Sequence, residues 1–183
     1  MTLKEKRLMM ESLGKKAVIF CDMDGVLAKW EAGCTFERTL EPHYFRGLEL
    51  EECVKNALLS LHEAGFEVCV LSAAYIDGTA REDKRSWLED FGLGELNYKF
   101  TICGENKANF IDTKPGVNYI LLDDYNVNLL KWSECTKNDC NFIAVKFLNG
   151  INGGSDTWKG RTVYHRSSGN IIAHTLADIA VMS

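Results

Sequence analysis

The chain has 183 residues, of which 46% are apolar and 26% charged, the composition of a folded globular protein rather than a disordered one. Its 26 acidic and 21 basic residues give a net charge of −5, so a general binding surface for nucleic acids or anionic membranes is not expected. One domain is the expectation at this length, and we assign residues 1–183 to it.

The seven cysteines are scattered, and no two have the Cys-x-x-Cys spacing of a zinc site. Cys21, Cys69 and Cys103 lie in apolar runs, where a thiol behaves as a small hydrophobic group. The charged N-terminus has no apolar stretch of signal-peptide length, and no run of about 18 apolar residues occurs anywhere. We therefore expect a cytoplasmic protein with reduced thiols and no contact with a membrane.

Short apolar runs alternate along the chain with patterns typical of helices. The runs that predict strands are 17–21, 68–71, 100–103, 119–122 and 142–145. They lack the alternation of half-buried strands, which indicates strands covered on both faces, as in a parallel sheet. Helical spacing is found in 53–64, 80–91, 126–133 and from residue 169 onward. This order predicts a doubly wound α/β domain with right-handed crossovers.

Three further segments complete the expected organisation. Leu3, Leu8, Met9 and Leu13 predict an N-terminal helix that packs on the core. Residues 28–49 follow the first strand without a clear period, and we interpret them as a small cap insertion. The Gly- and Asn-rich stretch 149–160 lacks the lysine and the strand–helix context of a P-loop, so we expect a structural loop there.

Acidic residues follow two of the predicted strands. Asp22 and Asp24 come directly after the first strand, and Asp123 and Asp124 follow the run 119–122. The carboxyl ends of parallel strands form one edge of the sheet, where ligands bind in such folds. Like charges gathered there raise one another's pKa, and a bound hard cation relieves the repulsion. The pattern therefore predicts a Mg²⁺ site with carboxylate ligands.

Such a site is suited to phosphoryl transfer. Asp22 is placed to act as a nucleophile that forms an aspartyl-phosphate, and Asp24 to protonate the leaving alcohol and then activate water. Gly25 permits the sharp turn that both side chains need. The Ser72 hydroxyl at the end of the second strand, the backbone N–H groups after it and a lysine would supply donors for the phosphoryl oxygens.

The segments CDMDGVLA, LSAA and LLDD resemble motifs I, II and IV of the haloacid-dehalogenase superfamily of phosphatases. The stretch ARED-Lys84-RS-Trp87 is similar to the E-K-x-x-W sequence of the 5′(3′)-deoxyribonucleotidase family. The run PHYFRGLELEECVKNALLSLHEAGFEVCVLS also resembles that family. The resemblance extends from about Lys16 to Trp132, and the short cap segment resembles the compact members of the group.

The resemblance implies a haloacid-dehalogenase core, with a Rossmann-like parallel sheet and the cap inserted after the first strand. It implies that Asp22 is the nucleophile and Asp24 the general acid and base. Mg²⁺ would be held by the Asp22 carboxylate, the main-chain carbonyl of Asp24 and the Asp123 carboxylate. We expect Asp124 to orient neighbouring groups rather than to bind the metal.

The same resemblance assigns the substrate contacts. Ser72 and Lys84 would bind the phosphate, and Ala73 stands in that motif where relatives carry a second hydroxyl. Lys107 competes with Lys84 for the role of the phosphate-binding lysine. Trp30 lies where the family places a ring against the nucleobase.

The expected function is that of a Mg²⁺-dependent phosphatase for a small phosphomonoester, above all a nucleoside or deoxynucleoside 5′-monophosphate. One alternative is the same reaction on a sugar or other metabolite phosphate. Another is a receiver-like module that accepts phosphate as a signal without turnover. We expect no nucleic-acid polymer and no membrane as partner, and the sequence leaves a homodimer open.

Overall fold

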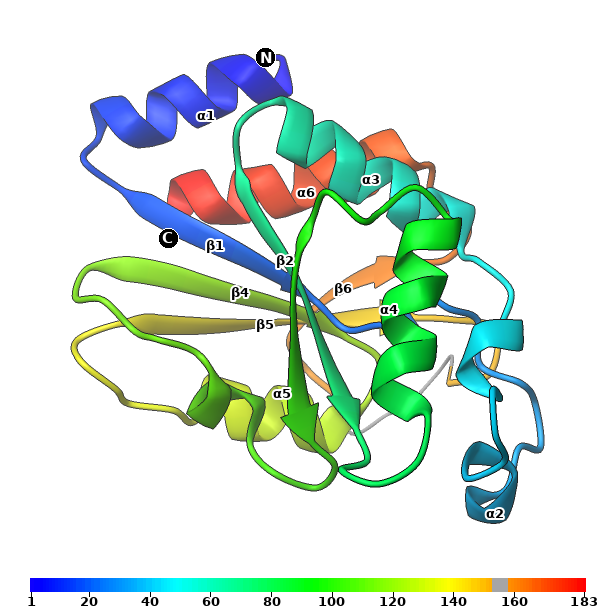
Figure 1. The fold of residues 1–183 in the computed structure, drawn as a ribbon. Coiled ribbons are helices and arrows are strands. Elements are labelled where there is room, and N and C mark those ends of the chain that lie inside the picture. Colours follow the sequence, from blue (N-terminus) through cyan, green and yellow to red (C-terminus); the bar gives the residue numbers. More distant parts are fainter. Residues whose placement is uncertain (153–157) are drawn as a thin grey trace.

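The structure, a computed structural model, describes residues 1–152 and 158–183. Its centre is a sheet of six parallel strands in the order β3-β2-β1-β4-β5-β6 (Figure 1). The strands are β1 (Lys16–Cys21), β2 (Glu67–Ala74), β3 (Asn97–Ile102), β4 (Val117–Asp123), β5 (Asn141–Leu148) and β6 (Arg161–Tyr164). The prediction of a doubly wound α/β fold is confirmed. The predicted loop 149–160 is described only at its two ends, because 153–157 lie outside the described residues.

Helices cover both faces of the sheet. They are α1 (Leu3–Ser12), α2 (Phe36–Thr39), α3 (Glu52–Glu63), α4 (Ala80–Asp90), α5 (Asn126–Ser133) and α6 (Gly169–Met182), with 3₁₀ helices η1 (Phe45–Gly47) and η2 (Lys107–Phe110). α1 and α3 pack against α6 on one side of the sheet, and α5 lies on the other (Figure 1). Within the described chain, no helix is long and apolar enough to cross a membrane.

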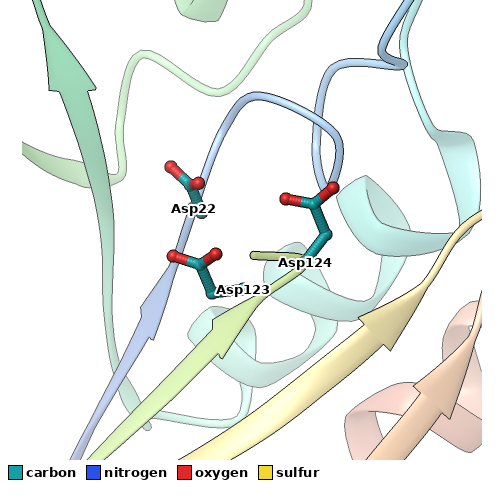
Figure 2. Close-up of side chains that lie close together, drawn as sticks. All are labelled: Asp22, Asp123 and Asp124. Atoms are coloured by element: carbon teal, nitrogen blue, oxygen red, sulfur yellow. The ribbon is translucent and has the colours of Figure 1, made fainter. Parts of the chain in front are cut away.

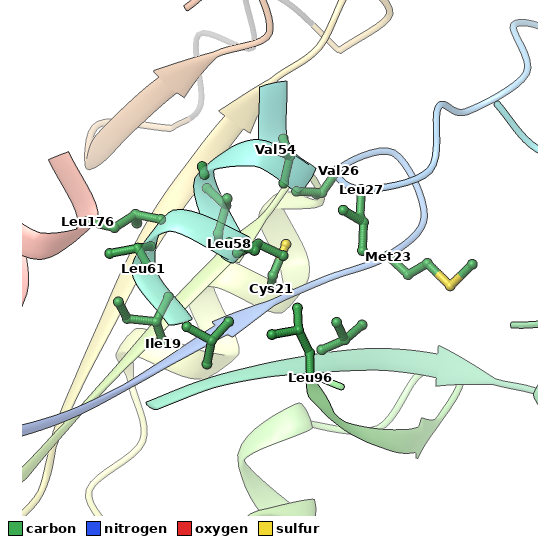
Figure 3. Packing of buried hydrophobic residues seen from close by; sticks show 14 of the residues in the cluster. Ile19, Cys21, Met23, Val26, Leu27, Val54, Leu58, Leu61, Leu96 and Leu176 are labelled. Atoms are coloured by element: carbon green, nitrogen blue, oxygen red, sulfur yellow. The ribbon is translucent and has the colours of Figure 1, made fainter. Parts of the chain in front are cut away.

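The larger core lies between β1 and α3. Val54, Leu58 and Leu61 recur at helical spacing and are buried against the side chains of Ile19 and Cys21 on the strand (Figure 3). Alternate residues of β1 point to opposite faces, so its other side chains enter a second core. Burial on both faces explains why the strand has a continuous apolar sequence.

The second core depends on Trp132 of α5. This side chain is fully buried, and its ring centroid lies 5.6 Å from that of Phe20 and 5.2 Å from that of Phe142. Its indole Nε1 donates a hydrogen bond of 3.0 Å to the Tyr119 carbonyl. One aromatic side chain therefore joins α5 to strands β1, β4 and β5.

The segment between β1 and α3, in which we predicted the cap, packs against α4. Its residues Tyr44, Phe45 and Leu48 are buried, and the Leu48 carbonyl accepts a 2.8 Å hydrogen bond from Trp87 Nε1. α2 of this segment lies at the periphery, beyond the carboxyl ends of the strands (Figure 1).

The N-terminal helix is present, but of the four side chains predicted to pack on the core only Leu3 does so. Leu8, Met9 and Leu13 are exposed, whereas Lys6 and Met10 are buried. Lys6 Nζ lies 2.6 Å from Asp178 Oδ1 and donates to a main-chain carbonyl of α6, so its aliphatic stem covers the helix beneath it. Apolar spacing alone did not identify this lysine as the contact.

Two details of the sheet also differ from the sequence prediction. β6 was not predicted, because only Val163 among its four residues is buried and no apolar run marks it. Cys103 is exposed instead of buried, since it follows β3, a strand at the edge of the sheet.

Replacing Trp132 by alanine should lower the free energy of unfolding by about 3 to 5 kcal/mol, because a large aromatic side chain and its hydrogen bond are lost from a closed core. Leu130→Ala on the exposed side of the same helix should change it by no more than about 0.5 kcal/mol. Urea denaturation followed by circular dichroism measures both. Equal losses in the two variants would mean that α5 is not anchored through Trp132.

Candidate active site

Three carboxylates meet at the carboxyl edge of β1 and β4. In the parallel register Cys21 lies beside Leu122, so Asp22 and Asp123 are the next residues along neighbouring strands. Ligand oxygens of Asp22, Asp123 and Asp124 all lie within 4.8 Å of one another. Figure 2 shows the three carboxylates, one following β1 and two at the end of β4.

A buried lysine joins two of these carboxylates. Lys107 Nζ lies 2.8 Å from Asp22 Oδ1 and 2.7 Å from Asp123 Oδ2. Burial alone would lower the pKa of Lys107, but the Asp123 and Asp22 carboxylates raise it above its usual range. The lysine is therefore a fixed positive charge. It lies in η2, which occupies the connection between β3 and β4.

Asp123 is fully buried, and both of its carboxylate oxygens accept hydrogen bonds. Its Oδ1 accepts a 2.8 Å hydrogen bond from the Tyr125 backbone N–H, and its Oδ2 accepts one of 3.0 Å from Asn128 Nδ2 in addition to the Lys107 contact. Burial raises the pKa of Asp123 to about 6, while the positive charge of Lys107 acts in the opposite direction.

Asp124 lies in the same acidic group. Burial, followed by the charges of Asp123 and Asp22, raises its pKa to about 8. Its carboxylate fits against the turn after β1, where Gly25 has φ +78°, and a Cβ at Gly25 would lie 2.7 Å from the Asp124 carboxyl carbon. The turn therefore requires glycine both for its backbone conformation and for the space taken by Asp124.

A second lysine holds Asp24. Lys84 Nζ lies 2.5 Å from Asp24 Oδ2 and donates to Ser72 Oγ at 3.0 Å and to the Ala73 carbonyl at 2.6 Å. The ammonium group also lies 4.4 Å from the centre of the Phe45 ring. Burial raises the pKa of Asp24, and the positive charge of Lys84 acts in the opposite direction. The other carboxylate oxygen, Asp24 Oδ1, has no hydrogen-bond partner among the described residues.

The charges of the site are unbalanced. With all four carboxylates ionised, Asp22, Asp24, Asp123 and Asp124 face only the two ammonium groups of Lys84 and Lys107, which leaves a formal charge of −2. Lys146 Nζ is 2.9 Å from the Asp124 carbonyl, and counting it still leaves −1. Clustered oxygen ligands with excess negative charge fit a hard divalent cation such as Mg²⁺.

The predicted residues therefore gather in two connected groups. Asp22, Asp123 and Lys107 form one, and Asp24, Ser72, Ala73 and Lys84 form the other. The sequence left Lys84 and Lys107 as alternatives for the phosphate-binding lysine. Both are buried at the site, Lys84 beside Asp24 and Lys107 beside Asp22 and Asp123. Trp30 is half-buried in the insertion after β1, and its role stays a prediction.

Asp124 lies at the predicted edge of the sheet, and its carboxylate belongs to the acidic group with Asp22 and Asp123. The Asp24 carboxylate is instead paired with Lys84 at the end of β2. That Asp124 orients its neighbours rather than binds the metal stays a prediction.

Polar residues that the sequence analysis missed surround the acidic group. Asn128 contacts Asp123, and Asn149 and Asn152 contact Asp124. Lys146 could have been noticed, because it interrupts the apolar run of β5 and is buried. The asparagines carry no comparable signal.

No protein-family model and no curated protein matches the sequence. Among solved structures, a chain from the "Structure of Pnkp1/Rnl/Hen1 complex" is similar, with a TM-score of 0.49 and 19% identity. The match covers 71% of this chain and 46% of that chain, so this chain corresponds to less than half of its neighbour. A likeness at this level bears on neither activity nor substrate.

Replacing Lys107 by methionine should lower the free energy of unfolding of the metal-free protein by about 3 kcal/mol, because two buried carboxylates lose their shared counter-charge. Lys4→Met, at an exposed position of α1, should leave it unchanged within about 0.5 kcal/mol. Urea denaturation in EDTA measures the difference. A Lys107→Met protein as stable as the wild type would show that the ion pairs are not formed.

Proposed function

We propose that the protein is a Mg²⁺-dependent phosphomonoester hydrolase that works through an aspartyl-phosphate at Asp22. The observation that carries the proposal is the acidic group of Asp22, Asp123 and Asp124 beside the buried Lys107. The resemblance of the sequence around these residues to haloacid-dehalogenase phosphatases supports it.

Asp22 is suited to the role of nucleophile. Its Oδ1 accepts hydrogen bonds from the Met23 backbone N–H at 2.7 Å and contacts Lys107, so both contacts orient the carboxylate through one oxygen. In the proposed first step Oδ2 attacks the phosphorus atom, and the bond from phosphorus to the leaving-group oxygen breaks. Lys107 beside Asp22 also supplies a positive charge close to the point where the phosphoryl group would be attacked.

Asp24 is suited to move the protons. Burial raises its pKa, and among the described residues Oδ1 has no hydrogen-bond partner while Lys84 holds Oδ2. The acid gives its proton to the leaving oxygen, which departs as an alcohol. The resulting carboxylate then removes a proton from water, whose oxygen attacks phosphorus and breaks its bond to Asp22. Inorganic phosphate leaves, and both aspartates return to their starting states.

The remaining groups would bind the cation and the phosphate. Asp22, Asp123 and Asp124, with the main-chain carbonyl of Asp24, would hold Mg²⁺, which neutralises phosphoryl oxygens and the carboxylates themselves. Lys107 and Ser72 would bind the other oxygens of the phosphate. Lys84 would support Asp24 and Ser72, both of which it already contacts.

The Asp22→Asn variant should lose hydrolysis of p-nitrophenyl phosphate by about a thousandfold or more, because an amide cannot form the covalent intermediate. Asp77→Asn, an exposed aspartate in the loop after β2, is the matched control and should keep full activity. Activity of the wild type should also vanish in EDTA. Full turnover by Asp22→Asn would refute the mechanism, and phosphorylation of Asp22 without turnover in the wild type would favour a receiver-like module.

We infer that the substrate is a nucleoside or deoxynucleoside 5′-monophosphate, from the resemblance and from Trp30 in the insertion after β1. Trp30→Ala should then raise KM for a nucleoside 5′-monophosphate about tenfold, since stacking on an aromatic ring contributes about 1–3 kcal/mol. KM for a sugar phosphate should not change in the same variant. If the wild type prefers sugar phosphates in a panel of phosphomonoesters, the alternative substrate class is correct.

A further inference from the structure

The segment after β5 makes an unusual set of contacts with the acidic site. Asn149 Nδ2 donates to the Gly25 carbonyl at 2.8 Å and to Asp124 Oδ2 at 3.1 Å. Asn152 Nδ2 lies 3.2 Å from the same Asp124 oxygen, 3.0 Å from the Asp124 carbonyl and 3.1 Å from the Phe147 carbonyl. Two amide side chains therefore converge on one carboxylate oxygen.

These contacts tie together three segments that are far apart in the sequence. Asn149 links the turn after β1 to the end of β4, because it binds both Gly25 and Asp124. The two asparagines also fix each other, since the Asn149 backbone N–H donates to Asn152 Oδ1 at 2.9 Å and the Asn152 backbone N–H donates to Asn149 Oδ1 at 2.7 Å. The donors are thus held in place before any ligand binds.

The chemistry of the donors differs from that at Asp123. Asp123 is held by the ammonium group of Lys107, whereas Asp124 is held through Oδ2 by neutral amides. A neutral amide orients a carboxylate through a hydrogen bond without bringing a positive charge to it. Without these bonds the Asp124 carboxylate would be repelled by Asp22 and Asp123 and would be free to turn away from them.

We propose that Asn149 and Asn152 are positioning residues that hold Asp124 as a ligand of the divalent cation. The inference rests on the proposed function, because it requires the cation site. It assigns a role to the start of the Gly- and Asn-rich loop, and it makes Asp124 a metal ligand whose orientation is set by the loop after β5.

The test measures metal affinity instead of activity. Titration of Mn²⁺ followed by electron paramagnetic resonance gives the dissociation constant for the wild type, Asn149→Ala, Asn152→Ala and the double variant. We expect the double variant to bind Mn²⁺ about tenfold more weakly or worse, as is typical when the groups that orient a metal ligand are removed. Asn170→Ala, at an exposed position of α6, is the control and should bind as the wild type does.

The outcomes separate this inference from the proposed function. A wild type that binds no Mn²⁺ would refute the cation site itself. A wild type that binds, with variants that bind equally well within twofold, would refute only the role of the asparagines. Circular dichroism checks that each variant is folded, and if the double variant is not, the two single variants decide, each expected to bind at least threefold more weakly.

Discussion

Four carboxylates meet at one edge of the sheet, two of them, Asp22 and Asp123, in buried positions, and this is the constraint on which the site depends. Buried like charges are costly, and this chain offsets them with two buried lysines from separate segments, Lys84 on α4 and Lys107 on η2. The compensation is incomplete, as the net charge of the group shows. This imbalance is the reason for which we propose that the site binds a divalent cation, and the two lysines are the groups that would contact an anionic substrate.

The order of the strands explains why these residues meet. From β1 the chain builds the sheet toward β2 and β3, then returns to the other side of β1 to add β4, β5 and β6. β1 and β4 are thus neighbours at the point where the winding direction reverses, which is where open α/β sheets bind ligands. Asp22 and Asp123 follow adjacent strands in register, so the backbone alone places them side by side. The lysines and asparagines then each contact one oxygen of the neighbouring carboxylate.

Much of this could be predicted from the sequence because strands buried on both faces have a strong signal. The apolar runs located β1 to β5, and acidic residues directly after β1 and β4 had to share an edge.

Other features of the fold and the site had no such signal in the sequence. β6 has a single buried side chain, and α1 packs through a lysine stem, so neither follows an apolar pattern. Asp124 is hydrogen-bonded by Asn149 and Asn152, which are about 25 residues away in the sequence and carry no local signal of this contact. Tertiary hydrogen bonds of this kind are decided by the fold and not by local spacing.

The most direct measurement is a crystal structure of the protein grown with Mn²⁺, with anomalous diffraction to locate the metal. The account predicts one strong peak bounded by carboxylate oxygens of Asp22, Asp123 and Asp124, at metal–oxygen distances of about 2.1 Å. A map with no peak among these three residues, and with Lys107 still bridging Asp22 and Asp123 as the sole counter-charge, would contradict it.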